Sequence, residues 1–199
     1  MKLNDYQTTA RETAIYGDSI LSMILEGKPD WVENEDTGGP HVFQSMRILY
    51  VQAGLMEEVC ELITHVDEGP SVEGITKELG DAAWYTAAWC TEWNIELQAA
   101  FKVGIAPPLN IPGSRLLTRL IKQARHFAGI SKRLLRDKKG VIDEDGRNEA
   151  AVAAGGVLRT LMALADFYEV GWEKVLSTNV EKLHSRQERG KLTGKGDER

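Results

Sequence analysis

The sequence predicts an all-α fold, and three observations support this prediction. Most of the 199 residues follow the 3.6-residue periodicity of amphipathic helices. Runs of β-branched residues with period-two alternation, which are typical of half-buried strands, are missing. Glycine and proline cluster at a few places and divide the chain into segments of helical length. We therefore expect helices joined by short turns and one linker.

Two groups of breakers divide the first half of the chain. Gly27 and the residues around it end the first amphipathic segment, and Gly69 ends the second. Ser71 then suits an N-cap, because its hydroxyl oxygen can accept a hydrogen bond from the first turn of the next helix. The expected elements are a helix over about 5–25, a loop over 29–40, a helix over about 44–66, and a helix from 71 to about 101.

The second half begins with a linker, because three prolines and a glycine fall within residues 105–114. Beyond it, a run of charged residues and later Gly171 separate three further amphipathic segments. The elements expected after the linker are helices over about 116–135, 149–168 and 172–186, a charged turn over 138–147, and an extended tail over 190–199.

The two halves of the chain show a weak internal duplication. Residues 80–95 align with 155–170 at an offset of 75, and their small and apolar positions largely match. Each half would be a helix pair with a helical extension, and two packed pairs give a four-helix bundle. We therefore predict a first repeat over 1–104, a linker over 105–114 and a second repeat over 115–199. The alternative is two unrelated hairpins that share only amphipathic periodicity.

Composition narrows the range of functions and locations. The formal net charge of −6 argues against a dedicated nucleic-acid binder, but not against a small anionic substrate. Cys60 and Cys90 lie within apolar helical patterns and suit buried, reduced thiols. The N-terminus lacks the apolar core of a signal peptide, and the apolar stretch 82–90 is too short to span a bilayer. We therefore expect a soluble cytoplasmic protein with no membrane partner.

Two acidic pairs lie on consecutive predicted helices. Glu58 and Glu61 are three residues apart, which places them on one helix face, and Glu57 borders that face. Glu78 and Asp81 repeat the spacing on the next helix, and both pairs stand among core-type residues. Like charges at this spacing repel, and partial burial makes the repulsion worse. A divalent cation would resolve the conflict, whereas solvated faces or helix-start charges are the alternative interpretation.

The residue types indicate which metal such a site would hold. Oxygen-only ligands favour Mg²⁺ or Mn²⁺. A di-iron bundle would need Glu-x-x-His on two helices, and the chain does not have that motif on two helices. His65 stands four residues after Glu61, which is the wrong spacing. Zinc is also disfavoured, because the chain has no His/Cys cluster.

These motifs resemble the MazG-like, all-α nucleoside triphosphate pyrophosphohydrolases. The signature of that family is Glu-Glu-x-x-Glu on one helix and Glu-x-x-Asp on the next, which here fall at 57–61 and 78–81. The segments 6–14, 179–186 and 194–199 also resemble phage and bacterial members of the family. The resemblance covers most of the chain in family order, and it implies a bundle of the four-helix type.

The resemblance also implies a reaction, in which water attacks the α-phosphorus of an NTP or dNTP and yields the monophosphate and pyrophosphate. It implies that Mg²⁺, or Mn²⁺ in its place, holds the nucleotide. Glu57 and Glu58 become the catalytic candidates, since either could orient or deprotonate the water. The implied metal ligands are Glu58, Glu61, Glu78 and Asp81.

The C-terminal part of the chain departs from the family pattern. Asn179, Lys182 and Arg186 match family positions that contact phosphate or sugar, but here they follow the second repeat. In that repeat the positions of the Glu-x-x-Asp motif are Ala153 and Gly156. We therefore predict one composite site per chain, with metal ligands from the first repeat and phosphate contacts from the second.

The second repeat also lacks a Glu-x-x-Glu motif, because no acid lies between Leu97 and Arg136. A basic stripe occupies this segment. It could steer a triphosphate towards the acids, and an ordinary solvated face is the alternative. The residues of the stripe are Arg115, Arg119, Lys122, His126 and Arg133.

Other functions remain open at the level of the sequence. The chain could be a non-catalytic nucleotide sensor or a helical scaffold. It could also hydrolyse a related anion, such as a nucleoside diphosphate or an alarmone. Members of the resembling family often assemble through their bundle, so a homo-oligomer is also open.

Overall fold

The computed structural model describes residues 1–17 and 39–191. Within these ranges the regular structure is helical and no strand occurs, which confirms the predicted all-α fold. The helices are α1 (Leu3–Glu12), α3 (Gly39–Glu68), α4 (Val72–Glu92), α5 (Leu97–Val103), α6 (Gly113–Lys138), α7 (Glu144–Phe167) and α8 (Trp172–Glu188).

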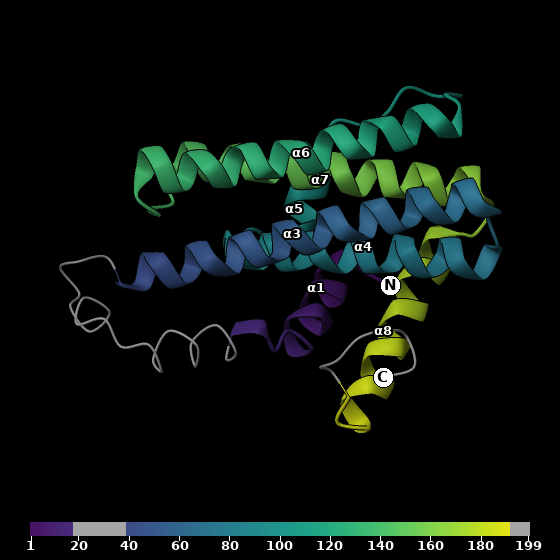
Figure 1. Ribbon diagram of the computed structural model, residues 1–199, viewed down its shortest axis with the longest axis horizontal. Coiled ribbons are helices and arrows are strands. Elements are labelled where there is room, and N and C mark those ends of the chain that lie inside the picture. Colours follow the sequence, from purple (N-terminus) through teal and green to yellow (C-terminus); the bar gives the residue numbers. More distant parts are fainter. Residues whose placement is uncertain (18–38, 192–199) are drawn as a thin grey trace.

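Four long helices, α3, α4, α6 and α7, form a four-helix bundle. Helix α3 packs against α4 and α6, and α7 packs against the same two helices, so the four close into a ring. Figure 1 shows the bundle as two layers, with the α6–α7 hairpin above the α3–α4 hairpin. A single hydrophobic core runs through both hairpins, and Leu55, Trp89, Phe127 and Leu158 are fully buried within it.

The other three helices flank the bundle. Helices α1 and α8 contact each other and both pack against α4. In Figure 1 they lie on the side of α4 that is turned away from the α6–α7 hairpin. Helix α5 packs mainly against α7. The first hairpin is therefore covered by α8, which belongs to the far end of the chain.

The two hairpins end in the same way at an offset of 75 residues. Asn94 and Glu169 both adopt positive φ angles, of 52° and 56°. In each case the next amide donates a hydrogen bond to the carbonyl five residues before it, which closes the helix end. Helices α5 and α8 then begin at positions that are again 75 residues apart.

Each extension helix packs against the other hairpin. A Cβ added at Gly80 of α4 would lie 2.9 Å from Cβ of Asn179 on α8, and a Cβ at Gly155 of α7 would collide with the backbone of Gly104, just after α5. The two glycines are 75 residues apart, and so are their two partners. The helices thus cross reciprocally at two close contacts. The duplication that would explain this arrangement stays a prediction.

Two predicted helices are shorter than expected. The first helix ends at Glu12, not near residue 25, and residues 18–25 lie outside the described part. The third was expected to reach residue 101, but α4 ends at Glu92 and α5 begins at Leu97. The break passes through Asn94, whose left-handed backbone stops a helix.

Other boundaries differ by smaller amounts. Helix α6 begins at Gly113, so the linker is shorter than the predicted 105–114. The predicted loop over 29–40 ends earlier, because α3 begins at Gly39; the rest of that loop and the tail over 192–199 lie outside the described residues. Cys60 is exposed, which corrects the prediction that both thiols are buried, whereas Cys90 is buried.

Helix α7 has the length and hydropathy of a membrane span, alone among the helices in the described ranges. Its most apolar window has a mean hydropathy of 1.4, and 61% of that window is buried inside the protein. Most apolar residues of α7, among them Ala154, Val157, Leu161 and Leu164, are buried in the core of the bundle, whereas Val152 and Phe167 are exposed.

Candidate metal centre

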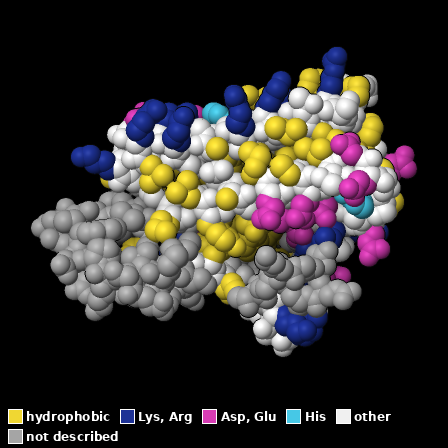
Figure 2. Space-filling model, viewed as in Figure 1, with side chains coloured by type: hydrophobic (Ala, Val, Ile, Leu, Met, Phe, Trp, Pro, Cys, Tyr) yellow, Lys and Arg dark blue, Asp and Glu magenta, His cyan; other side chains and the backbone are white. Residues whose placement is uncertain are grey.

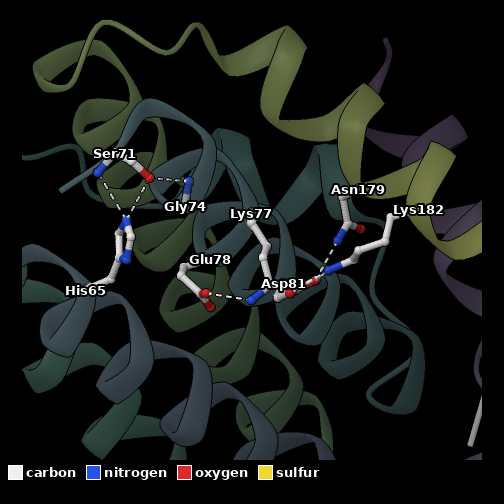
Figure 3. A network of polar contacts seen from close by, with 8 residues as sticks. All are labelled: His65, Ser71, Gly74, Lys77, Glu78, Asp81, Asn179 and Lys182. Carbon is white, nitrogen blue, oxygen red and sulfur yellow. Dashed lines mark hydrogen bonds and ion pairs between the residues drawn. The ribbon is translucent and has the colours of Figure 1, made fainter. Parts of the chain in front are cut away.

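The turn between α3 and α4 holds the two helices that carry the acids. Ser71 caps α4, since its Oγ accepts a hydrogen bond of 3.0 Å from the Gly74 amide, as predicted. The Ser71 amide in turn donates to Nε2 of His65 on α3, at 3.2 Å (Figure 3). His65 is therefore hydrogen-bonded to the N-cap of the next helix. This bond holds the end of α3 against the start of α4, one to two helical turns away from the acids.

Three of the predicted ligands come together between α3 and α4. Carboxylate oxygens of Glu58, Glu78 and Asp81 all lie within 4.8 Å of one another. Glu61 is exposed and lies outside this group, although it is close enough to Glu78 for their charges to interact. Glu57 is exposed as well. The structure thus assembles a three-carboxylate cluster, with the other two acids at its rim.

Glu78 shows most directly that the cluster suits a cation. Its side chain is only 8% exposed, and Lys77 contacts Oε1 at 3.0 Å. The other oxygen, Oε2, is buried and receives no hydrogen bond from the described residues. A buried carboxylate oxygen without a partner is costly, and a hard cation would satisfy it. The residues present therefore fit a hard divalent cation.

The electrostatics of the cluster lead to the same conclusion. Burial, followed by the charges of Asp81, Glu61 and Glu78, raises the pKa of Glu58 to about 8, with Lys182 opposing the shift. Burial and the neighbouring acids, Glu78 first among them, also raise the pKa of Glu61. In the protein alone, Glu58 is therefore largely protonated at neutral pH. A cation among the carboxylates would favour the ionised form.

Helix α8 completes the cluster from the far end of the chain. The Lys182 ammonium contacts both carboxylate oxygens of Asp81, and Nδ2 of Asn179 donates to Oδ1 of Asp81 at 2.8 Å (Figure 3). Lys182 and Asp81 are both largely buried, with side chains 20% and 18% exposed. Arg186, one turn further along α8, is also buried. Two of the three predicted phosphate-binding residues therefore contact the acidic cluster directly.

Tyr6 is a contributor that the sequence did not single out. It is buried on α1, and its hydroxyl lies 2.8 Å from Oδ1 of Asn179 and 3.2 Å from the Gly80 carbonyl oxygen. Because the hydroxyl donates to the amide oxygen, it turns the NH₂ group of Asn179 towards Asp81. The segment 6–14 had been noted only for its resemblance, which gave no role for this hydroxyl.

A cavity extends the site along the same two helices. Tyr85 lies one turn beyond Asp81 and fills the space left by Gly54 on α3. Beyond it is a cavity of about 560 Å³, where the hydroxyl of Tyr16 donates to Glu92 at 2.7 Å. Buried Nε of Arg47 faces this region and has no hydrogen-bond partner among the described residues. Sequence reasoning missed this cavity, because its lining residues come from three separate segments.

The fold and the cluster together define an all-α protein of the four-helix-bundle type, with a carboxylate centre that could hold a divalent cation. The chain is 36% identical over 80 residues to the gene 37 protein of Mycobacterium phage L5, a match that spans 40% of this chain and 70% of the phage protein. It therefore belongs to the same family as that phage protein. No family model and no solved structure matches the chain.

Proposed function

We propose that the protein is a nucleoside triphosphate pyrophosphohydrolase, which converts an NTP or dNTP and water to the monophosphate and pyrophosphate. The observation that carries the proposal is the position of the Lys182 ammonium and the Asn179 amide directly against a cluster of buried carboxylates. Carboxylates that need a cation stand next to donors that suit phosphate oxygens. The resemblance to the MazG-like enzymes adds the reaction type.

The residues of the cluster have distinct roles in this proposal. Glu58, Glu78 and Asp81 would hold Mg²⁺ or Mn²⁺, with Glu61 able to join from the rim. The ion would neutralise the charge of the phosphates and polarise the reacting bond. Glu57 or Glu58 would orient the attacking water and take its proton.

The groups on α8 would bind the part of the substrate that leaves. Lys182 reaches Asp81 without a ligand, so a triphosphate that brings its own cation would release the ammonium to pair with phosphate oxygens. Asn179 would keep its bond to Tyr6 and donate from its NH₂ group. Arg186 lies one turn further on and would act as a second cation for the pyrophosphate product.

The cavity lined by Tyr16, Arg47 and Glu92 would take the nucleoside. It lies along the same stripe of α3 and α4 as the carboxylates, since Asp81 and Glu92 are eleven residues, or about 16 Å, apart on one helix. That length matches an extended nucleotide whose phosphates lie at the acids. A carboxylate and an arginine at the far end would meet the polar edge of a base. A nucleotide substrate fits a cytoplasmic protein, and so do the free thiols of Cys60 and Cys90.

Measurement of pyrophosphate release tests the proposal. The purified chain is incubated with the common NTPs and dNTPs and Mg²⁺, and pyrophosphate and monophosphate are quantified separately. We expect equal amounts of both products, loss of activity with a chelator, and loss in Glu78→Gln and Asp81→Asn. Glu68→Gln is the control, because Glu68 is an exposed acid at the end of the neighbouring helix α3 and lies outside the cluster.

Two results would contradict the proposal. Release of inorganic phosphate and a diphosphate would show that a different phosphoanhydride bond is cleaved. Nucleotide binding without turnover, under conditions in which the protein is folded and Mg²⁺ is present, would favour the sensor. The same substrate panel, extended to nucleoside diphosphates and alarmones, separates the remaining hydrolase alternatives.

A further inference from the structure

Helix α6 carries a charge distribution that the carboxylate centre does not explain. It contains eight lysines and arginines and a single acid, Asp137, although the whole chain has a net charge of −6. Figure 2 shows lysine and arginine side chains in a row along the edge of the molecule formed by this helix, while the acidic side chains gather elsewhere on the same face. A third of the 24 lysines and arginines of this acidic protein therefore lie on one helix.

Half of these cations make neither an ion pair nor a side-chain hydrogen bond with the described residues. Arg119 bonds the Ile105 carbonyl and Thr160, and three others near the C-terminal half pair with Glu149, Asp137 and Asp143. The cations that remain are all exposed, and we call them the α6 basic face: Arg115, Lys122, Arg125 and Lys132.

The spacing of the α6 basic face gives its shape. On a helix, positions 115, 122, 125 and 132 fall within an arc of about 100°, and they span about 26 Å along the axis. An ordinary solvated helix face carries acids at i,i+4 to balance its cations, and between 113 and 136 this helix has none. Within α6 the only acid is Asp137, beyond the C-terminal end of the face, where its charge interacts with Lys132; Arg115, Lys122 and Arg125 have no acid on this helix to balance them.

The basic face is not placed to serve the carboxylate centre. Helix α6 packs against α3 and α7, and it lies diagonally across the bundle from α4, which supplies Glu78 and Asp81. A triphosphate bound at those acids would lie at the corner of the bundle formed by α4 and covered by α8, and α6 forms the opposite corner. Steering of the substrate, which the sequence left open, is therefore not the use that this placement favours.

We propose that the α6 basic face binds the phosphate backbone of double-stranded DNA. A straight row of cations about 26 Å long matches most of one duplex turn, about 34 Å. Single-stranded nucleic acid would call for exposed aromatic rings that stack on bases, and the one aromatic residue of α6, Phe127, is fully buried. A membrane surface would call for a continuous apolar row beside the cations, whereas the exposed large apolar residues of α6 are Ile121 and Leu135, which are well separated, and the rest of its apolar stripe faces the core.

Backbone contacts of this kind carry no sequence information, so the binding is expected to be independent of sequence and sensitive to salt. The proposal departs from the expectation that the negative net charge gave, because binding of a polyanion depends on the local field of one face. It does not rest on the proposed enzymatic activity, since the two surfaces use different helices.

Fluorescence anisotropy with a labelled DNA duplex of about 20 base pairs tests the proposal. We expect binding at low salt, with log K falling against log salt at a slope of roughly −3 to −4 for four neutralised phosphates. Lys122→Glu with Arg125→Glu is expected to weaken binding at least tenfold. The matched control, Lys102→Glu with Lys174→Glu, makes the same charge change at exposed cations of α5 and α8, and it is expected to retain binding.

The outcomes separate the alternatives. Loss of binding in the α6 variant alone, with an unchanged circular dichroism spectrum and unchanged pyrophosphate release, supports the proposal. Arg115→Ala with Lys132→Ala provides a second variant of the same face if the first does not fold. The proposal is overturned if the duplex does not bind at low salt, if the control variant loses as much affinity, or if anionic vesicles bind and the duplex does not.

Discussion

The ammonium of Lys182 contacts both carboxylate oxygens of Asp81, although 101 residues separate the two along the chain. The contact joins the last helix to the first hairpin, and it places the ammonium cation of Lys182 against the acidic cluster. It is the structural basis for a site with contributions from both halves of the chain. Whether those contributions act together in catalysis can be tested with single substitutions.

Lys182→Met should lower the free energy of unfolding when no divalent ion is present. With the ion present, it should impair catalysis. Removal of the ammonium leaves Asp81 and its neighbours uncompensated, at a cost of about 1–3 kcal/mol for a largely buried pair. We expect a lower Tm in chelator, partial recovery with Mg²⁺, and a kcat/KM reduced at least tenfold. If Lys182→Met and Arg186→Ala both leave catalysis and substrate affinity unchanged, the composite site is wrong.

Tyr6→Phe should disturb the site without removing any group that faces the acids. The loss of the hydroxyl frees the amide of Asn179 to rotate, at a cost to stability of about 1 kcal/mol. We expect a rise in KM that Asn179→Ala reproduces, with no further loss when the two changes are combined. Independent, additive effects in this double-mutant cycle would show that Tyr6 does not act through Asn179.

The affinity for a divalent ion should rise with pH. The pKa of Glu58 is raised to about 8, so below that pH the carboxyl must lose a proton before it can serve as a ligand. Calorimetry in buffers of different ionisation enthalpy should detect proton release on Mg²⁺ binding near pH 7. Glu58→Gln should remove this release, and a release that persists in the variant would assign the proton to another group.

The same pKa shift sets the sign of a stability change. A glutamate whose pKa is higher in the folded state than in the unfolded state binds an extra proton when folded, between pH 4.5 and about 8. The ion-free protein should therefore lose free energy of unfolding as the pH rises through this window. Denaturant titrations of the wild type and Glu58→Gln, in chelator, check this, and a flat difference between them would contradict it.

Gly80→Ala should separate α8 from α4. The added Cβ would lie 2.9 Å from Cβ of Asn179 and 3.3 Å from the Val175 carbonyl oxygen, so the helices must move apart. We expect a lower Tm and weaker binding of the ion. Gly129→Ala is the matched control, because its nearest neighbour is the flexible end of Arg133 at 3.5 Å, and a mid-helix alanine there should stabilise by about 0.5–1 kcal/mol.

Arg47→Ala should affect the nucleoside end of the proposed site. Arg47 lines the cavity, with its Nη1 3.9 Å from the buried carboxylate of Glu92. We expect KM to rise and kcat to change little, because the residue lies far from the acids. A fall in kcat at unchanged KM would show that Arg47 acts in the chemical step and does not bind the nucleoside.

Local patterns predicted the parts of the site that lie on one helix or on two consecutive helices. The three-residue spacing of Glu78 and Asp81 correctly placed them together, and Ser71 capped its helix as expected. Glu61 is three residues from Glu58 but lies at the rim, because residues at this spacing still differ in direction by about a sixth of a turn around the helix axis. Such a rule cannot tell which edge of the face meets the next helix.

Long-range partners could not be predicted from spacing. The proximity of Lys182 to the acids was suggested by the family resemblance alone, and nothing in the sequence joined Tyr6 to Asn179. Both contacts depend on how α8 crosses α4, which is decided by the small volume of Gly80. The break at Asn94 was missed for a related reason: the surrounding residues continue the helical pattern, and the turn depends on one left-handed residue.

The packing of α5 against α7 and of α8 against α4 affects how the protein responds to dilution. Because α8 reaches α4 within the same chain, the contact between Lys182 and Asp81 persists at any concentration at which the chain is folded. Two separate subunits that exchanged such helices would lose the contact as they dissociated. A chain cut within residues 105–112 should likewise stay one particle, since each fragment holds a helix that is packed against the other.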